Sequence, residues 1–150
     1  MIEKEDHEKR IVVGVDGSEQ SRRALRWAIR QARLTHAVVE AVMAWQPPFS
    51  GVGSVVSVEQ RNQIGEIAQK ALAENIEKVA GSEPPVEIRA HAVEGVAAQA
   101  LLDVAAQGAS LLVVGHRGVG GFTGALLGSV GQHCVQHAPC PVVVVRGRDG

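Results

Sequence analysis

Glycines near the C-terminus follow a spacing that suits an anion-binding loop. Two residues separate Gly115 from Gly118, and nine more separate Gly118 from Gly128 and Ser129. Because glycine has no Cβ, the backbone amides of such a loop can approach a polyphosphate closely. Ser129 also begins a predicted helix, whose first N–H groups and positive dipole end attract anions. We therefore interpret this segment as a site for nucleotide phosphates.

Buried strands and amphipathic helices alternate along the chain and must position this loop. Short apolar runs predict strands at Ile11–Val15, Val38–Trp45, Val86–Val93, Leu111–Val114 and Pro141–Val145. Apolar residues at helical spacing predict helices at Glu19–Leu34, at Ile64–Val79, from Gly95 onward and at Ser129–His137. Strands that are apolar on both faces and alternate with helices favour an α/β fold with a parallel sheet and right-handed crossovers.

A polar turn follows the first strand and supplies a second candidate binding group. Asp16, Gly17 and Ser18 separate the strand from the first helix, and Ser18 is a candidate N-cap of that helix. The Asp16 carboxylate is an acceptor for hydroxyl hydrogen bonds. The alternative is that Asp16 only shapes the turn, and Ser129 likewise has an N-cap role that is compatible with phosphate binding.

The apolar residues of the second and third predicted helices indicate which side chains face the core. We expect the second helix to bury Ile64 and Ile67 and to end at Gly81, and the third to bury Val96.

Length and composition limit the possible functions. The 150 residues predict one domain over residues 9–146, with a flexible N-terminus at 1–8 and a loose tail at 147–150. Fifteen basic residues against sixteen acidic ones leave no electrostatic signature of nucleic-acid binding. No apolar run has the length of a membrane span and the N-terminus is highly charged, so we expect a cytoplasmic protein without a membrane partner.

Three stretches together resemble the universal stress protein family. They are Gly-Val-Asp-Gly-Ser at 14–18, Val-Val-Gly-His-Arg-Gly at 113–118 and Ala-Pro-Cys-Pro-Val at 138–142. The resemblance covers roughly residues 8–146. It implies a Rossmann-like, five-stranded parallel sheet in the order 3-2-1-4-5 with helices on both faces. That order places Asp16 and Gly115 at a topological switch point, where open α/β sheets bind ligands.

The resemblance also implies binding of ATP, with Mg²⁺, by residues from both sides of this switch point. Asp16 would accept hydrogen bonds from ribose hydroxyls, and the backbone of Ala44 would contact adenine. Gly14 and Val15 would lie close to the adenosine. The phosphates would be bound by the glycine motif and the helix start, namely Gly115, Arg117, Gly118, Gly128, Ser129 and Val130. The family's nucleotide-binding branch forms dimers, which implies a homodimer through Val142–Val145.

Two positions depart from the family pattern. Gly131 stands where nucleotide-binding relatives often carry Ser or Thr, so a second phosphate-binding hydroxyl is absent. It also weakens the first turn of its helix by roughly 0.5–1 kcal/mol relative to Ala. His116 replaces a small residue and would add a polar contact.

Two cysteines and two histidines near the C-terminus are candidates for other chemistry. His133 and His137 have a spacing that can hold zinc, with Cys134 beside them, but no third ligand is evident. We therefore expect a solvated helix face and no metal site. Cys134 and Cys140 are expected to be reduced thiols with apolar packing roles.

Three functions remain open from the sequence. The first is a regulatory dimer of the stress response that binds ATP and acts on an unidentified protein partner. The second is a slow ATP hydrolase or a phosphoryl or adenylyl transferase. The chain lacks the P-loop lysine and a clear base for the attacking water, so at most weak catalysis is expected. The third is a nucleotide-free structural dimer.

Overall fold

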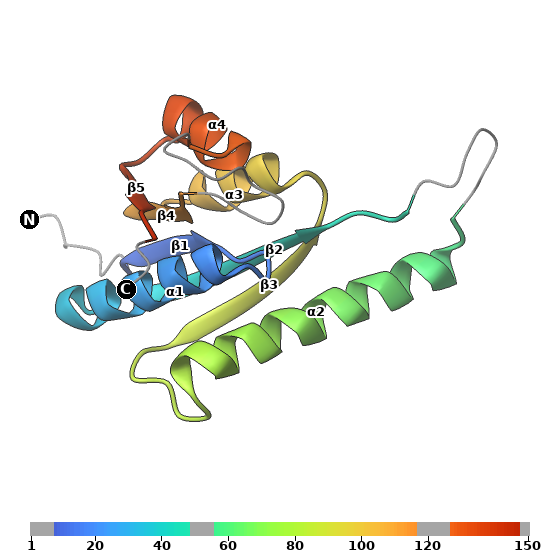
Figure 1. The fold of residues 1–150 in the computed structure, drawn as a ribbon, viewed down its shortest axis with the longest axis horizontal. Coiled ribbons are helices and arrows are strands. Elements are labelled where there is room, and N and C mark those ends of the chain that lie inside the picture. Colours follow the sequence, from blue (N-terminus) through green and yellow to red (C-terminus); the bar gives the residue numbers. More distant parts are fainter. Residues whose placement is uncertain (1–7, 49–55, 117–126, 148–150) are drawn as a thin grey trace, which may run out of the picture.

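The computed structural model describes residues 8–48, 56–116 and 127–147. The strands are β1 (Arg10–Gly14), β2 (Val38–Trp45), β3 (Ile88–Glu94), β4 (Leu111–Gly115) and β5 (Val142–Val145). The helices are α1 (Glu19–Thr35), α2 (Val58–Ala80), α3 (Ala97–Ala105) and α4 (Ser129–His137). All strand pairs are parallel, and the sheet order is β3-β2-β1-β4-β5 (Figure 1). The predicted fold class and strand order are confirmed.

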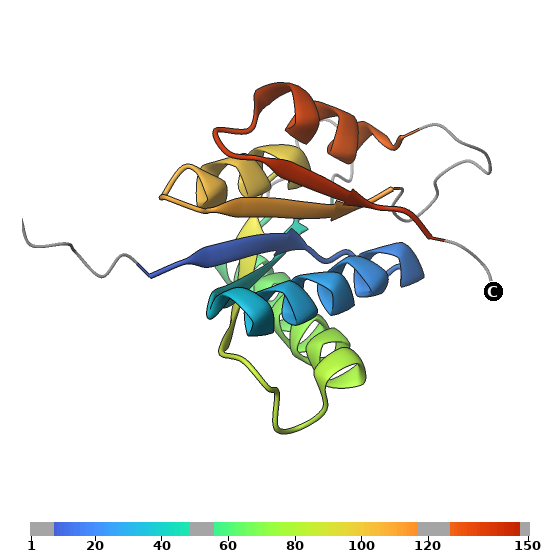
Figure 2. The same cartoon turned by 90° about the vertical axis from the view of Figure 1, so that its left-hand side faces the viewer.

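Two pairs of helices cover opposite faces of the sheet. Figure 2 shows α1 and α2 on one side, with α3 and α4 on the other. A hydrophobic core lies on each face of the sheet, and alternate residues of β1 point into one or the other. Ile11 and Val13 pack against α1 and α2, whereas Val12 packs against α3. The middle residues of β1 and β4 are buried on both faces, as the continuous apolar runs predicted.

The long helix α2 begins earlier than predicted because a capping box starts it. The Ser57 hydroxyl accepts the backbone N–H of Gln60 at 3.1 Å, and the Gln60 side chain accepts the N–H of Ser57 at 2.9 Å. The expectation that Ile67 is buried is wrong, because it is 68% exposed. The buried positions of α2 are Ala68 and Leu72, which face the sheet.

The third helix begins later than predicted, and Val96 is not on its buried side. Gly95 has φ 144°, a conformation that L-residues rarely adopt and that does not belong to a helix. Val96 is the N-cap with extended backbone, and its side chain is 60% exposed. The helix therefore starts at Ala97 and buries Ala98, Ala100 and Leu101.

Among the residues that the structure describes, no helix is both long enough and apolar enough to cross a bilayer.

Candidate functional site

The carboxyl ends of β1 and β4 lie next to each other. The two strands pair directly, with Val13 opposite Val113. Gly14 ends β1 one residue after this pair, and Gly115 ends β4 two residues after it. Asp16 follows β1 at the same edge of the sheet. The structure thus brings together the two sequence motifs that the resemblance assigned to one switch point.

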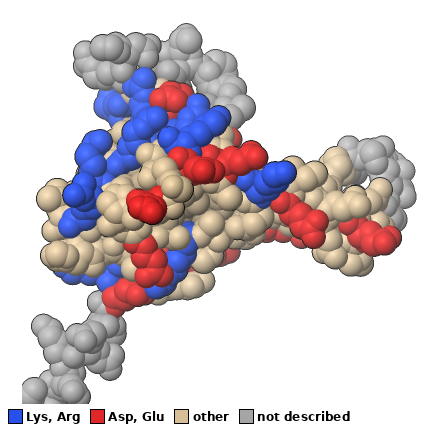
Figure 3. All heavy atoms as spheres, turned by 90° about the horizontal axis from the view of Figure 1, so that it is seen from below, with Lys and Arg blue, Asp and Glu red and all other residues tan. Residues whose placement is uncertain are grey.

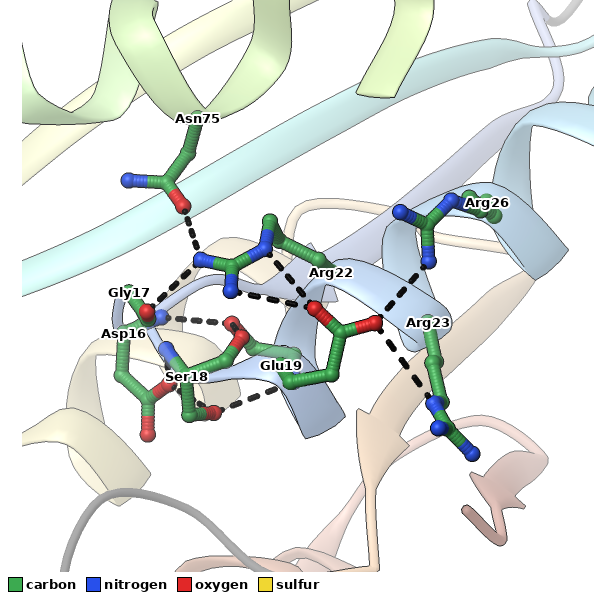
Figure 4. Close-up of polar contacts among 9 residues, drawn as sticks. Asp16, Gly17, Ser18, Glu19, Arg22, Arg23, Arg26 and Asn75 are labelled. Atoms are coloured by element: carbon green, nitrogen blue, oxygen red, sulfur yellow. Dashed lines mark hydrogen bonds and ion pairs between the residues drawn. The ribbon is translucent and has the colours of Figure 1, made fainter. Parts of the chain in front are cut away.

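The Asp16 carboxylate is held in place by the turn that it belongs to. Its Oδ1 accepts hydrogen bonds from the backbone N–H of Ser18 at 2.9 Å and from the Ser18 hydroxyl at 2.6 Å (Figure 4). The backbone N–H of Asp16 donates to Ser21 Oγ at 3.1 Å. Asp16 is therefore a turn residue, as the alternative interpretation held, and its side chain is also exposed and oriented.

Ser18 is the N-cap of α1, as predicted. Its hydroxyl oxygen accepts the backbone N–H of Ser21 at 3.1 Å while its backbone is extended. The same hydroxyl donates to Asp16, so the start of the helix and the orientation of the carboxylate depend on one side chain.

Arg22, which no sequence pattern pointed to, stabilises this turn. Arg22 Nη1 donates to the carbonyl of Gly17 at 2.8 Å and to Asn75 Oδ1 on α2 at 3.2 Å (Figure 4). The hydrogen bond from Arg22, together with the nearby Arg26, lowers the pKa of Glu19 below its ordinary value. The contact with Asn75 spans 53 positions of sequence, so no local pattern reveals it.

Gly115 has a packing role that the sequence did not reveal. A Cβ built on Gly115 would lie 2.9 Å from the backbone carbonyl oxygen of Gln20, at the start of α1. Backbone cannot yield as a flexible side chain does, so only glycine fits where the end of β4 meets this helix. Gly14 is also tight, but its Cβ would meet the side-chain tip of Leu101 at 3.0 Å.

The backbone of His116 connects the end of β4 to β5 and to the start of α4. Its backbone N–H donates to the carbonyl of Val145 at 3.0 Å, and its carbonyl accepts the N–H of Gly128 at 2.8 Å. The side chain is buried. These bonds bring Gly128 back beside Gly115, so both ends of the glycine motif meet. Arg117 and Gly118 lie outside the described residues.

The start of α4 is the second candidate binding group at this edge. Gly128 is its N-cap, and no side chain of the described ranges caps the helix. Ser129, which is exposed, and Val130 form the first turn, where backbone N–H groups have no acceptor within the helix. Gly131 is buried, and a Cβ there would lie 2.9 Å from Leu127 Cδ1. A Ser or Thr at 131 would therefore have to displace Leu127.

The residues expected near the adenosine flank β1. Val15 is buried, and its N–H donates to the carbonyl of Val42 on β2 at 2.8 Å. Ala44 lies further along β2, near the same edge, and is half-buried. Apart from Arg117 and Gly118, the structure places all the predicted site residues at the carboxyl edge of β1, β2 and β4 or in the first turn of α4.

The histidines and cysteines of the C-terminal region form no metal-binding cluster among the residues that the structure describes. The rings of His133 and His137 lie 4.5 Å apart between centroids. The ranges that the structure describes contain no group of three or more residues able to hold a metal ion. Cys134 and Cys140 are free thiols, and burial raises the pKa of Cys134 to about 11.

Known proteins resemble this chain in sequence and in fold. The model of the universal stress protein family matches residues 8–146. A universal stress protein of Mycolicibacterium smegmatis is 36% identical over 148 residues, which cover 93% of this chain and 48% of that relative. This chain spans about half the length of the first curated relatives that it matches.

Two solved structures extend the comparison. The universal stress protein UspA from Lactobacillus plantarum has a TM-score of 0.76 and 25% identity, with 92% of this chain and 97% of that chain covered. A universal stress protein described in complex with cAMP has a TM-score of 0.64 and 27% identity, with 93% and 97% covered. The chain belongs to the universal stress protein family.

Proposed function

We propose that the protein binds ATP at the carboxyl edge of β1 and β4 and acts as a nucleotide-dependent regulator of the stress response. One observation carries the proposal: the oriented carboxylate of Asp16 and the start of α4, which no described side chain caps, lie at the same edge of the sheet. A carboxylate suits ribose hydroxyls, and a helix start suits phosphates. The relative in complex with cAMP supports an adenine nucleotide as the ligand class.

The residues at the start of α4 fit a polyphosphate better than a metal ion alone. Backbone N–H groups from Ser129 onward and the Ser129 hydroxyl would hold the phosphate oxygens. Mg²⁺ usually reaches proteins through phosphates and one or two carboxylates rather than an all-protein cage. Since no cluster of three metal-ligating residues lies in the described ranges, Mg²⁺ would arrive with the nucleotide and be held chiefly by its phosphates. Its contribution would be to neutralise their charge.

Regulation fits the site better than catalysis. Lysine occurs only at positions 4, 9, 70 and 78, so the glycine motif has no lysine of the P-loop kind. The groups of the site that the structure describes are suited to binding and orienting a nucleotide: Asp16 would accept hydrogen bonds from hydroxyls, and the start of α4 would hold anions. At most weak ATPase activity would follow, and turnover beyond the bound nucleotide would favour the hydrolase or transferase alternative.

A homodimer through β5 completes the proposed function. Val142–Val145 form an edge strand that pairs with β4, and all four residues are half-buried. An exposed edge rich in valine favours pairing with another strand. We place this dimer in the cytoplasm, where its nucleotide state would select a protein partner.

The proposal is tested by calorimetric titration of ATP with Mg²⁺ into the protein and into Asp16→Ala. We expect the substitution to weaken binding by about 1 kcal/mol or more, the contribution of a lost hydrogen bond to a charged group. Asp103→Ala on α3, which removes another exposed carboxylate, is the matched control and should bind normally. Unchanged affinity in a folded Asp16→Ala variant would reject this site, and no binding to either protein would favour the nucleotide-free structural dimer.

A further inference from the structure

Gly17 occupies the middle of the turn that carries Asp16, and side-chain packing does not hold it. Its φ is 86°, in the left-handed region that glycine enters without strain. A Cβ built on Gly17 would meet no atom of the described residues within 4 Å. Because glycine has the widest choice of backbone conformations, the turn needs a contact from elsewhere to keep one of them.

The contact comes from Arg22, which binds the carbonyl of Gly17. Its Nη1 donates to this carbonyl at 2.8 Å. The Gly17 carbonyl and the Ser18 N–H belong to one planar peptide group, so a hydrogen bond to the first also fixes the direction of the second. The Ser18 N–H donates to Asp16 Oδ1 at 2.9 Å. Arg22 therefore helps to orient the Asp16 carboxylate through a single peptide group (Figure 4).

A second contact joins Arg22 to the neighbouring helix α2. Arg22 Nη1 also donates to Asn75 Oδ1 at 3.2 Å, and Asn75 Nδ2 donates to the carbonyl of Ala71 at 2.9 Å. These two partners leave one orientation for the Asn75 amide, since an arginine needs an acceptor and a carbonyl needs a donor. The turn after β1 is therefore anchored to α2 through Arg22.

Glu19 engages the remaining nitrogens of Arg22, so this side chain is suited to positioning the turn rather than to binding an anion. Nε and Nη2 lie 3.2 Å and 3.0 Å from Glu19 Oε1, and the Arg22 side chain is 20% exposed. Glu19 Oε2 also pairs with Arg26 at 3.4 Å. Figure 3, the view from below, likewise shows acidic side chains next to basic ones. A phosphate would have to replace Glu19 to reach the Arg22 guanidinium.

We propose that Arg22, held by Asn75, is a positioning residue that helps to set the Asp16 carboxylate for ribose hydroxyls. It would thereby favour nucleotides that carry these hydroxyls over nucleotides that lack them. The inference rests on the proposed function, in which Asp16 accepts hydrogen bonds from the ribose. A carboxylate that is already held in one orientation binds hydroxyls with a smaller loss of side-chain freedom. Removal of the Arg22 contact therefore weakens recognition of the hydroxyls and leaves the contacts of the base and the phosphates in place.

The test compares the binding of ATP and of dideoxy-ATP, which lacks both hydroxyls of the ribose. Each nucleotide is titrated with Mg²⁺ into the full chain and into Arg22→Ala in a calorimeter. We expect the natural chain to bind ATP about tenfold more tightly than dideoxy-ATP, because the analogue offers no donors to the Asp16 carboxylate. Arg22→Ala should weaken the binding of ATP by about fivefold and that of dideoxy-ATP by less than about twofold. A purely structural role would weaken the binding of both nucleotides equally.

Arg26→Ala is the matched control for the loss of an arginine beside Glu19. Arg26 also pairs with Glu19, but it has no hydrogen bond to the turn within the described ranges. The control should bind both nucleotides within about twofold of the natural chain, because an exposed ion pair contributes little.

Two substitutions of Asn75 test the anchor on α2. Asn75→Leu removes the acceptor for Arg22, so its preference for ATP should fall as in Arg22→Ala. Asn75→Asp keeps an oxygen acceptor at this position and should retain the preference of the natural chain. Equal preferences in the two variants would contradict the role of the anchor.

Three outcomes would overturn the inference and leave the proposed nucleotide site intact. They are unchanged ATP affinity in Arg22→Ala, equal losses of affinity for the two nucleotides in that variant, and equal affinities of the natural chain for both nucleotides. No binding of either nucleotide to the natural chain would instead overturn the proposed function, and this inference with it. Circular dichroism reports whether Arg22→Ala folds, and Asn75→Leu takes its place in the same comparison if it does not.

Discussion

The hydroxyl of Ser18 lies 2.6 Å from Asp16 Oδ1 and also accepts the N–H of Ser21. One side chain therefore caps α1 and fixes the carboxylate that we propose to bind ribose. We therefore expect folding stability and ligand affinity to be coupled at this position, because the Ser18 hydroxyl that starts the helix also helps to orient Asp16.

We expect Ser18→Ala to lower stability and ATP affinity together. Loss of an N-cap costs about 1 kcal/mol of unfolding free energy, and the substitution also removes one of the two hydrogen bonds that Ser18 donates to the Asp16 carboxylate. Urea denaturation and ATP titration measure the two effects. Ser18→Thr retains a hydroxyl and is the control, so equal losses in both variants would contradict the role of the hydroxyl.

Gly128→Ala separates phosphate binding from folding. Gly128 has φ −68°, which alanine adopts without strain, so we expect the variant to fold, with a loss of unfolding free energy below about 1 kcal/mol because alanine is a poorer N-cap than glycine. The added methyl group would hold a phosphate away from the start of α4 and weaken ATP binding by about 1 kcal/mol or more. Normal ATP affinity in the folded variant would show that phosphates do not approach the backbone here.

Gly115→Ala should have the opposite profile and act mainly on stability. Its new Cβ would press on the carbonyl oxygen of Gln20, and overpacking of this kind costs about 1–3 kcal/mol. Gly14→Ala is the comparison, because the Leu101 side chain that it meets can move. Equal unfolding free energies of the two variants would contradict the close backbone contact.

The raised pKa of Cys134 predicts a loss of stability in alkaline solution. The pKa is raised from 9.0 to about 11 by burial of the thiol and by the nearby Cys140. The folded state therefore holds its proton more tightly than the unfolded state, and the resulting stability is lost as pH rises through this interval. Urea midpoints between the two pKa values should fall more steeply for the natural chain than for Cys134→Val. Parallel slopes would contradict the assignment.

Local patterns predicted the elements that strong signals define. The bounds of β2 and of α4 agree with the prediction, since an apolar run between turn signals marks one and the glycine motif marks the other. Ser18 was found because a serine between a turn and an apolar helix face is an N-cap signal. The strand order came from the family resemblance, which no periodicity supplies.

Contacts between distant segments account for what the sequence did not reveal. Helical spacing alone placed Ile67 and Val96 inside, but α2 turns Ala68 and Leu72 toward the sheet instead of Ile67, and the conformation of Gly95 delays the start of α3 until after Val96. The packing of Gly115 against Gln20 and the brace from Arg22 to Asn75 join residues of separate elements. Such contacts depend on the assembled sheet, so residue types and spacing do not encode them visibly.

The nucleotide content of the purified protein tests the proposed site most directly. The protein is denatured, and adenine nucleotides in the supernatant are separated by anion exchange and quantified against the chain. We predict ATP in an amount close to equimolar with the chain, and far less from Asp16→Ala purified in parallel. A mixture rich in ADP would instead favour hydrolysis. An empty protein that also takes up no added ATP with Mg²⁺ would contradict nucleotide binding and leave the glycine motif with a structural role.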